Sequence, residues 1–348
     1  MGVGSGLGSQ IVLAQETTFG TPLLTGARAI EFNSETLELK KKTVQGQGLH
    51  AGGLIDRSNR RGVVEYDVNG DVAFNVPTKS FGLVIENMIG SFGNATISAP
   101  VAGMCTQVHQ PGTLQGHFMT LQKGVPGNDG TVTPVTYTGV KFADWELDQS
   151  KSAIMTCKLG CDGRDELLTT STPTAGLGLA SAAYLPTARE FNFLQCTVRT
   201  GTPTITSGVL SLASPTVLGY GEKFTLKGAT PMKTDRYFFG SNGRKSEQIE
   251  NGFRKLDGTL DVEWTLPAAW YNSFQSDATV PLQFTFVEPA TLTNPCTLDM
   301  IIPACKLNGS SPKVGGPDMV MQNLSFTGLD DGTNPHIQFT YISTDTAI

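Results

Sequence analysis

Two stretches of this chain nearly repeat one another: Asp71-Val72-Ala73-Phe74-Asn75-Val76-Pro77 and Asp261-Val262-Glu263-Trp264-Thr265-Leu266-Pro267. Each reads as a β-strand that a proline ends, and an aromatic residue, Phe81 or Tyr271, follows at the same distance. Proline has no backbone N–H to give to a strand ladder, so it is expected where a strand stops. Repetition of this kind predicts one supersecondary unit duplicated within the chain.

The repeat extends to both ends of each copy. Glu31-Phe32-Asn33 opens the first copy and Glu190-Phe191-Asn192 the second. Later residues correspond at one constant spacing: Val140-Lys141-Phe142, Met155, Leu159, Cys161 and Gly163 match Cys305-Lys306-Leu307, Val320, Leu324, Phe326 and Gly328. We therefore predict an N-terminal arm (1–27), a first β-module (28–165), a linker rich in Thr, Ser, Ala, Gly and Pro (166–186) and a second β-module (187–348). The alternative is convergent β patterning with similar turns.

The strand of the first copy runs through a glycine. Apolar residues keep one parity on both sides of Gly70, whereas a two-residue hairpin at Asn69-Gly70 would mix the apolar and polar faces. One continuous strand is therefore predicted, with Gly70 on the core face at a bend or a close backbone approach. The second copy keeps its phase through Gly258 in the same way. Strands this long exceed the usual five or six residues, so we expect them to pair beyond their own domain.

A short amphipathic helix should follow each of these strands. In the first copy, Pro77 and Thr78 open it, Gly90 ends it, and the apolar stripe is Phe81, Val84, Ile85, Met88 and Ile89. Trp270, Tyr271 and Phe274 form a shorter version in the second copy. Residues 28–39 alternate and predict a strand, residues 40–61 read as a long polar loop, and residues 2–26 read as an arm outside the core.

Composition supports an all-β protein. The 348 residues include 40 glycines and 19 prolines with only 16% charged residues, and Asn-Gly and Asp-Gly pairs recur between apolar alternations.

A net charge of −6 argues against a surface built to bind nucleic acid, and the basic run Lys40-Lys41-Lys42 is interpreted as a solvated loop. No stretch reaches the roughly 18 apolar residues of a membrane span, and no secretory signal is visible. Cys157 and Cys161 should share a buried strand face as reduced thiols.

No catalytic, metal or cofactor site is predicted. Asp144, Glu146 and Asp148 share a strand face but lack the glycine and carbonyl ligands of a calcium loop, so a solvent-facing acidic strand is expected. The glycines at 4, 6 and 8 lack the strand and helix that a phosphate-binding loop requires. No serine lies in a nucleophile elbow, and the four histidines are scattered singly. The chain is therefore predicted not to be an enzyme and to need no cofactor.

Several stretches spread over the chain resemble tail tube proteins of long, non-contractile-tailed bacteriophages. The opening, Gly4-Ser5-Gly6-Leu7-Gly8-Ser9-Gln10 and Ala14-Gln15-Glu16-Thr17-Thr18-Phe19-Gly20-Thr21-Pro22, is similar to that family. So are Val76-Pro77-Thr78-Lys79-Ser80-Phe81-Gly82, Asp235-Arg236-Tyr237-Phe238-Phe239-Gly240, Asn251-Gly252-Phe253-Arg254-Lys255 and Gly316-Pro317-Asp318-Met319-Val320-Met321-Gln322. No single motif is diagnostic. Their order along the chain carries the resemblance.

The resemblance implies two tandem β-sandwich or barrel modules with short flanking helices, whose extended hairpins join neighbouring subunits in a large barrel. Stacked rings would form the tail tube that conducts genomic DNA, which passes through the lumen without specific binding. Expected partners are further copies of the chain and the tape measure, tail terminator and distal tail proteins. The expected location is the virion tail, after assembly in the host bacterial cytoplasm.

The resemblance also implies an assembly. One-module members build rings of six, so a two-module chain is expected to form a trimer with pseudo-sixfold symmetry; a true hexamer follows if one copy alone kept the channel-lining hairpin. Candidate subunit-interface residues are Lys42, Gln45, Gln47, Arg57, Arg60, Arg61, Arg236 and Arg254. The alternative function is a carbohydrate- or receptor-binding β-sandwich of a tail tip. That function needs exposed aromatic platforms, whereas Trp145, Trp264 and Trp270 lie within strand or helix patterns, as core residues do.

Overall fold

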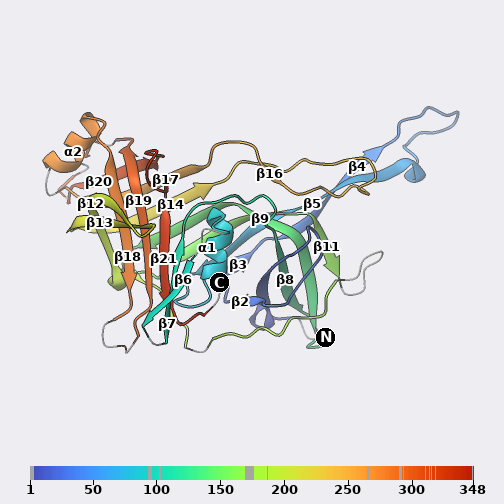
Figure 1. Cartoon of the computed structure of the whole chain (residues 1–348). Coiled ribbons are helices and arrows are strands. Elements are labelled where there is room, and N and C mark those ends of the chain that lie inside the picture. The colour runs from blue at the N-terminus through green and yellow to red at the C-terminus, as the bar shows by residue number, and fades with distance from the viewer. Residues whose placement is uncertain are drawn as a thin grey trace.

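The computed structural model describes residues 4–348 apart from 93–95, 102, 169–175, 186, 265–266, 290–291, 293, 310, 313, 315, 318 and 347. The described chain is nearly all β, as predicted, with two short α-helices (Figure 1). The strands are β1 (Gln10–Gln15), β2 (Arg28–Ile30), β3 (Ser34–Glu35), β4 (Glu38–Gln45), β5 (Arg61–Asn75), β6 (Thr96–Val101), β7 (Met104–His109), β8 (Met119–Pro126), β9 (Val132–Ser150), β10 (Thr156–Gly163), β11 (Asp165–Leu168), β12 (Cys196–Thr206), β13 (Val209–Val217), β14 (Gly221–Ala229), β15 (Met232–Lys233), β16 (Ile249–Glu250), β17 (Lys255–Glu263), β18 (Val280–Val287), β19 (Thr297–Leu307), β20 (Met321–Gly328) and β21 (Gln338–Ser343). The helices are α1 (Gly82–Ile89) and α2 (Pro267–Gln275).

A seven-stranded antiparallel sheet runs through both halves of the chain. Its order is β4–β5–β10–β9–β14–β17–β20, and we call it the inner sheet. One face packs on the core, and the other carries polar side chains. Beneath it, β2, β1, β8, β9 and β11 pair in the first half. The strands β13, β12, β18, β19 and β21 pair in the second half, and β7 and β6 of the first half continue that layer beyond β21.

The two halves share strands at two junctions. In the inner sheet, β9 of the first half pairs with β14 of the second, from Asp144–Ala229 to Ser150–Lys223. In the other layer, β7 pairs with β21 through five residue pairs, from Cys105–Ser343 to His109–Phe339. Buried residues of both halves form one continuous hydrophobic core. The division into modules at 28–165 and 187–348 stays a prediction, and much of the predicted linker lies outside the described residues.

The continuous strand through Gly70 is confirmed. β5 extends over fifteen residues, and Gly70 has φ +147°, in the region that favours glycine. A Cβ there would lie 2.5 Å from the carbonyl oxygen of Thr36, so the segment before β4 crosses directly over this glycine. In the second half, β17 runs through Gly258 and ends at Glu263; Leu266, expected in the same strand, lies outside the described residues.

The pairing of the strands changes the alignment of the two repeats by two residues at one place. Cys161 pairs with Gly70, and its repeat partner Phe326 pairs with Gly258, so the two glycines are structurally equivalent. The similar stretches that begin at Asp71 and Asp261 are therefore offset by two residues in the ladders. Because side chains alternate with a period of two, this offset leaves every residue on its predicted face.

The predicted helices are present. α1 ends at Gly90, which adopts φ +69° as expected of a glycine C-cap, but the helix begins at Gly82 rather than near Thr78. Seven of the eight α1 residues are buried. Residues 28–39, predicted as one strand, are interrupted and form β2, β3 and the start of β4.

The predictions for residues 2–26 and 40–61 were wrong. Part of the stretch 2–26 lies in the core, because β1 buries Ile11, Val12, Leu13 and Ala14 and pairs with both β2 and β8. The polar stretch 40–61 is not one loop, because β4 extends through Lys40, Lys41 and Lys42 to Gln45 and pairs with β5. A strand that is exposed on both faces needs no alternation of apolar and polar residues, because its hydrogen bonds to the neighbouring strand are enough to form it. The lysine run therefore gave no strand pattern in the sequence, although it lies in β4.

Candidate assembly interfaces

A long hairpin projects from the first half of the molecule. β4 and the first half of β5 extend away from the core, with residues 46–60 at the far end (Figure 1). Every residue from 46 to 60 is exposed. Among them, Leu54 is 97% and Ile55 87% exposed, and Leu49 is fully exposed. Adjacent apolar side chains held this far from a core are typical of a surface that a partner covers.

Six of the eight predicted interface residues lie on this hairpin. Lys42 forms an ion pair with Glu65 at 3.0 Å, the Gln45 side chain donates to the carbonyl of Arg57, and Arg61 donates to Thr43. The remaining hairpin residues of that set are Gln47, Arg57 and Arg60, all exposed. Their contacts with other subunits stay a prediction.

The second half of the molecule sends out a different kind of extension. Residues 230–254 connect β14 to β17, as the hairpin end connects β4 to β5, and we call them the crossing segment. It runs back over the first half and lies beside the root of the hairpin (Figure 1). Tyr237 donates to the carbonyl of Tyr66, and the Tyr66 N–H donates to Gly243, so the segment is bonded directly to β5. It is therefore packed within its own chain.

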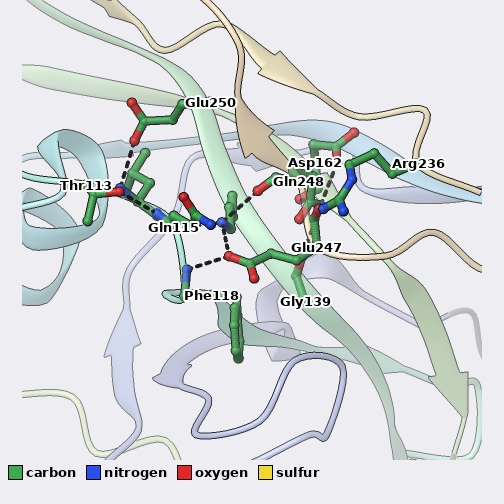
Figure 2. A network of polar contacts seen from close by, with 12 residues as sticks. Thr113, Gln115, Phe118, Gly139, Asp162, Arg236, Glu247, Gln248 and Glu250 are labelled. Carbon is green, nitrogen blue, oxygen red and sulfur yellow. Dashed lines mark hydrogen bonds and ion pairs between the residues drawn. The ribbon is translucent and has the colours of Figure 1, made fainter.

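Buried ion pairs fix the crossing segment to the first half. The side chain of Lys245 is 1% exposed, and its ammonium contacts Asp67 of β5 and Asp162 of β10, the latter at 2.8 Å. Gln248 donates to the same Asp162 carboxylate and to the carbonyl of Gly139 (Figure 2). Burial raises the pKa of Asp162, and Lys245 opposes that rise. A buried lysine shared by two carboxylates permits one geometry, because an unpaired buried charge is costly.

A second set of contacts surrounds Glu247 and Glu250. Glu247 forms an ion pair with buried Lys141 at 2.7 Å, and burial lowers the pKa of this lysine. Glu250 accepts a hydrogen bond from the backbone of Leu114 and pairs with Arg254 at 2.7 Å. Figure 2 shows these carboxylates reaching from the crossing segment toward loop 113–118.

The remaining two predicted interface residues, Arg236 and Arg254, lie on the crossing segment and contact their own chain. Arg236 donates to the carbonyl of Glu247, and Arg254 donates to the carbonyls of Ile89 and Gly112. Asp235 pairs with Lys233, and Arg254 pairs with Glu250. Sequence reasoning missed Lys245, Glu247 and Asp162, whose contacts join residues far apart in the chain.

The polar face of the inner sheet carries cross-strand charge pairs. Their spacing is 2.8 Å for Lys158–Asp71, 3.0 Å for Lys227–Glu146 and 3.4 Å for Lys223–Asp148. The acidic strand predicted at 144–148 is thus on a solvent-facing surface, but two of its three carboxylates pair with lysines of β14. From β5 to β17 this face carries more carboxylates than ammonium groups: Asp71, Asp144, Glu146, Asp148, Asp257, Asp261 and Glu263 against Lys158, Lys223, Lys227 and Lys255.

A cavity of about 510 Å³ lies between α2 and the second half's sheet. Trp264, Trp270, Leu218 and Val280 are among its lining residues. Trp145 is buried in the core as predicted. Trp264 and Trp270 are partly buried and line this cavity, and Trp270 also packs against the hydrophobic core, so the prediction of core residues was wrong for Trp264 alone.

Within the described ranges, no group of three or more His, Cys, Asp and Glu side chains is placed to hold a metal ion. No helix among the residues that the structure places is long and apolar enough to cross a membrane. Cys157 and Cys161 are both buried on β10, as predicted, and burial raises the pKa of both thiols.

A projecting hairpin with apolar residues at its end, and a sheet that already joins two repeats edge to edge, are features of a structural subunit that assembles with others. A family model described as phage tail tube protein matches residues 6–328 of the chain, and the chain belongs to that family. A search of curated proteins finds no match.

Family membership gives the general role. The chain is a structural, non-enzymatic component of the phage tail, and it assembles with itself into a tube and associates with other tail components. This role favours the tube subunit over the carbohydrate-binding tip module considered from the sequence.

Proposed function

We propose that three copies of this chain form a ring with pseudo-sixfold symmetry, and that stacked rings form the conduit through which genomic DNA leaves the virion. The observation that carries the proposal is the junction between β9 and β14, at which the inner sheets of the two repeats join into one sheet. In the proposed ring, each chain supplies two such sheets side by side. Three chains then give six sheets around the channel.

The ends of the inner sheet support closure by a similar junction between chains. Among the described residues, β4 pairs along one side only, with β5. At the opposite end, β19 and β20 share three residue pairs, whereas the corresponding β9 and β10 share seven. We propose that β4 of one chain joins this less complete end of the next. A contact between two different surfaces closes into a ring when its rotation allows.

The polar face of the inner sheet is proposed to line the channel. Its excess of carboxylates would repel DNA phosphates weakly over about 8 Å at physiological salt, so that DNA slides rather than binds. The pairing of Glu146 with Lys227 and of Asp148 with Lys223 keeps this field mild.

The proposed channel lining is tested by charge reversal. Glu146→Lys and Asp257→Lys together should slow DNA ejection from intact particles, because lysines on the lining attract phosphate. Glu31→Lys is the control, since Glu31 is exposed and directly follows β2, a strand of the other layer. Ejection at the wild-type rate from virions that carry both lysines would overturn the proposed lining.

The proposed partners are the tape measure protein inside the growing tube, the terminator protein at one end and the distal tail protein at the other. Assembly is placed in the host bacterial cytoplasm. The six free cysteines are consistent with that reducing setting.

Electron microscopy of the purified protein tests the ring. Tubes averaged without imposed symmetry should show three identical chains per ring and six similar sheets around the channel. Six identical chains per ring would contradict the trimer. A protein that stays monomeric at high concentration would overturn the proposed assembly altogether.

A further inference from the structure

The cavity beside α2 exists because the second half lacks a segment that the first half has. In the first half, residues 90–118 lie between α1 and β8, and they include β6, β7 and buried Leu114 and Phe118. Gly112 of this segment donates to the carbonyl of Ile89 at the end of α1. In the second half only residues 276–279 separate α2 from β18. Among the described residues, the short connection from α2 to β18 supplies no counterpart of the side chains that residues 90–118 place around α1.

The chemistry of the cavity suits an apolar segment with positive charge beside it. Trp264, Trp270, Val280 and Pro281 form much of its wall, and Glu263 adds a carboxylate. At its rim, Val217 is 58% and Tyr220 62% exposed. Large aromatic surfaces in a partly open cavity are typical binding anchors.

The end of the hairpin has the complementary chemistry. Leu54 and Ile55 are adjacent and almost fully exposed. Arg57 and Arg60 follow them in the same exposed segment, residues 46–60. Two neighbouring aliphatic side chains can enter a cavity of this size, while the arginines remain at the rim. The acidic Glu263 matches these arginines in charge.

The two surfaces lie at opposite ends of the molecule. Figure 1 places α2 at one extreme of the chain and the end of the β4–β5 hairpin at the other. One chain cannot therefore insert its hairpin into its own cavity, but a neighbour arranged head to tail can. The crossing segment offers an internal precedent, since an equivalent β–β connection already packs on the other repeat.

We propose that residues 46–60 of one copy dock in the α2 cavity of a neighbouring copy, with Leu54 and Ile55 against Trp264 and Trp270. The partner is a second copy of this chain, and the inference rests on the tube assembly proposed above. The hairpin supplies to α2 the apolar cover that residues 90–118 supply to α1.

Two variants test the contact from its two sides. Leu54→Asp with Ile55→Asp changes the hairpin, and Val217→Asp changes the rim of the cavity. Both sites are exposed in the single chain, so the monomer should keep its circular dichroism spectrum and melting temperature. Each variant should raise the protein concentration needed for tube formation at least tenfold. Leu194→Asp, at a position 88% exposed elsewhere, is the matched control and should assemble normally.

Cross-linking gives a second measurement that does not depend on assembly being lost. Ile55→Cys protein mixed with Val217→Cys protein should form a disulfide-linked dimer under mild oxidation during tube growth. Either variant alone, which carries one added cysteine beside the six native ones, should form far less of it. Tubes that assemble normally from both aspartate variants, with no mixed dimer, would overturn this docking while leaving the tube proposal intact. Failure of the wild-type chain to form any tube would instead overturn the tube proposal itself.

Discussion

The two β–β connections of this molecule, residues 46–60 and residues 230–254, occupy equivalent places in the two repeats and have opposite surroundings. The first projects with exposed Leu54 and Ile55, whereas the second packs on the other repeat through buried Lys245. In the docking proposed above, one contact between the halves is made inside the chain, while its counterpart is made with another chain. The difference separates interactions that fold the subunit from those that assemble it.

The largest expected effect comes from breaking the internal contact. Lys245→Met leaves Asp67 and Asp162 without their shared cation, and removing one member of a buried ion pair costs about 3–5 kcal/mol. We expect a loss of that size in the free energy of unfolding, measured by urea titration. Without these ion pairs the crossing segment should detach from the first half, so a protease should cleave it faster than in the wild type.

The control is Lys233→Met, because Lys233 pairs with Asp235 on the exposed part of the same segment. Exposed pairs contribute about 0–1 kcal/mol, so this variant should stay near wild type. Equal stabilities of the two variants would show that the buried cluster does not hold the segment.

The two long strands were predictable from sequence because their information is local. Alternating apolar residues through Gly70, and the stripe of α1 ending at Gly90, need no knowledge of distant residues. β1 was missed because its four apolar residues, 11–14, lie among Gly, Ser and Thr. β4 was missed because its lysines give no alternation. The cluster around Lys245 was not predictable, since Asp67, Asp162 and Lys245 meet only after the whole chain has folded.

A middle-sized effect should come from the glycine that the long strand of the first repeat requires. Gly70→Ala places a methyl group 2.5 Å from a backbone oxygen at a positive φ, so backbone must move. We expect a loss of about 2–3 kcal/mol, in the range of strained backbone sites. The measurement is again urea denaturation of the soluble chain.

Gly62→Ala on the same strand is the matched control. Nothing lies within 4 Å of a Cβ at position 62, so alanine should be neutral or stabilise by up to about 1 kcal/mol through the unfolded chain. If Gly70→Ala were as stable as Gly62→Ala, the close crossing at Gly70 would be wrong, and the hairpin would not need its present bend.

The smallest effect concerns the helix that is covered in one repeat and not in the other. Burial raises the pKa of Glu86 on α1 from its ordinary value of 4.5 to about 7. A carboxyl with a higher pKa in the folded chain binds more protons when folded, so this group lowers stability as pH rises from about 4.5 through 7. Glu86→Gln removes that loss and should gain about 1 kcal/mol at pH 8 after allowance for solvent screening. Near pH 4 the variant and the wild type should have equal stability.

Stability measured from pH 4 to pH 8 should therefore fall less steeply in Glu86→Gln than in wild type. Part of the slope should remain, because burial also raises the pKa of Glu16 to about 7, although Gly139 and Gly20 donate hydrogen bonds to its carboxylate. An unchanged slope would mean that water reaches Glu86 freely. The cover over α1 would then not exclude water, and the contrast between the two helices would fail as an account of the cavity beside α2.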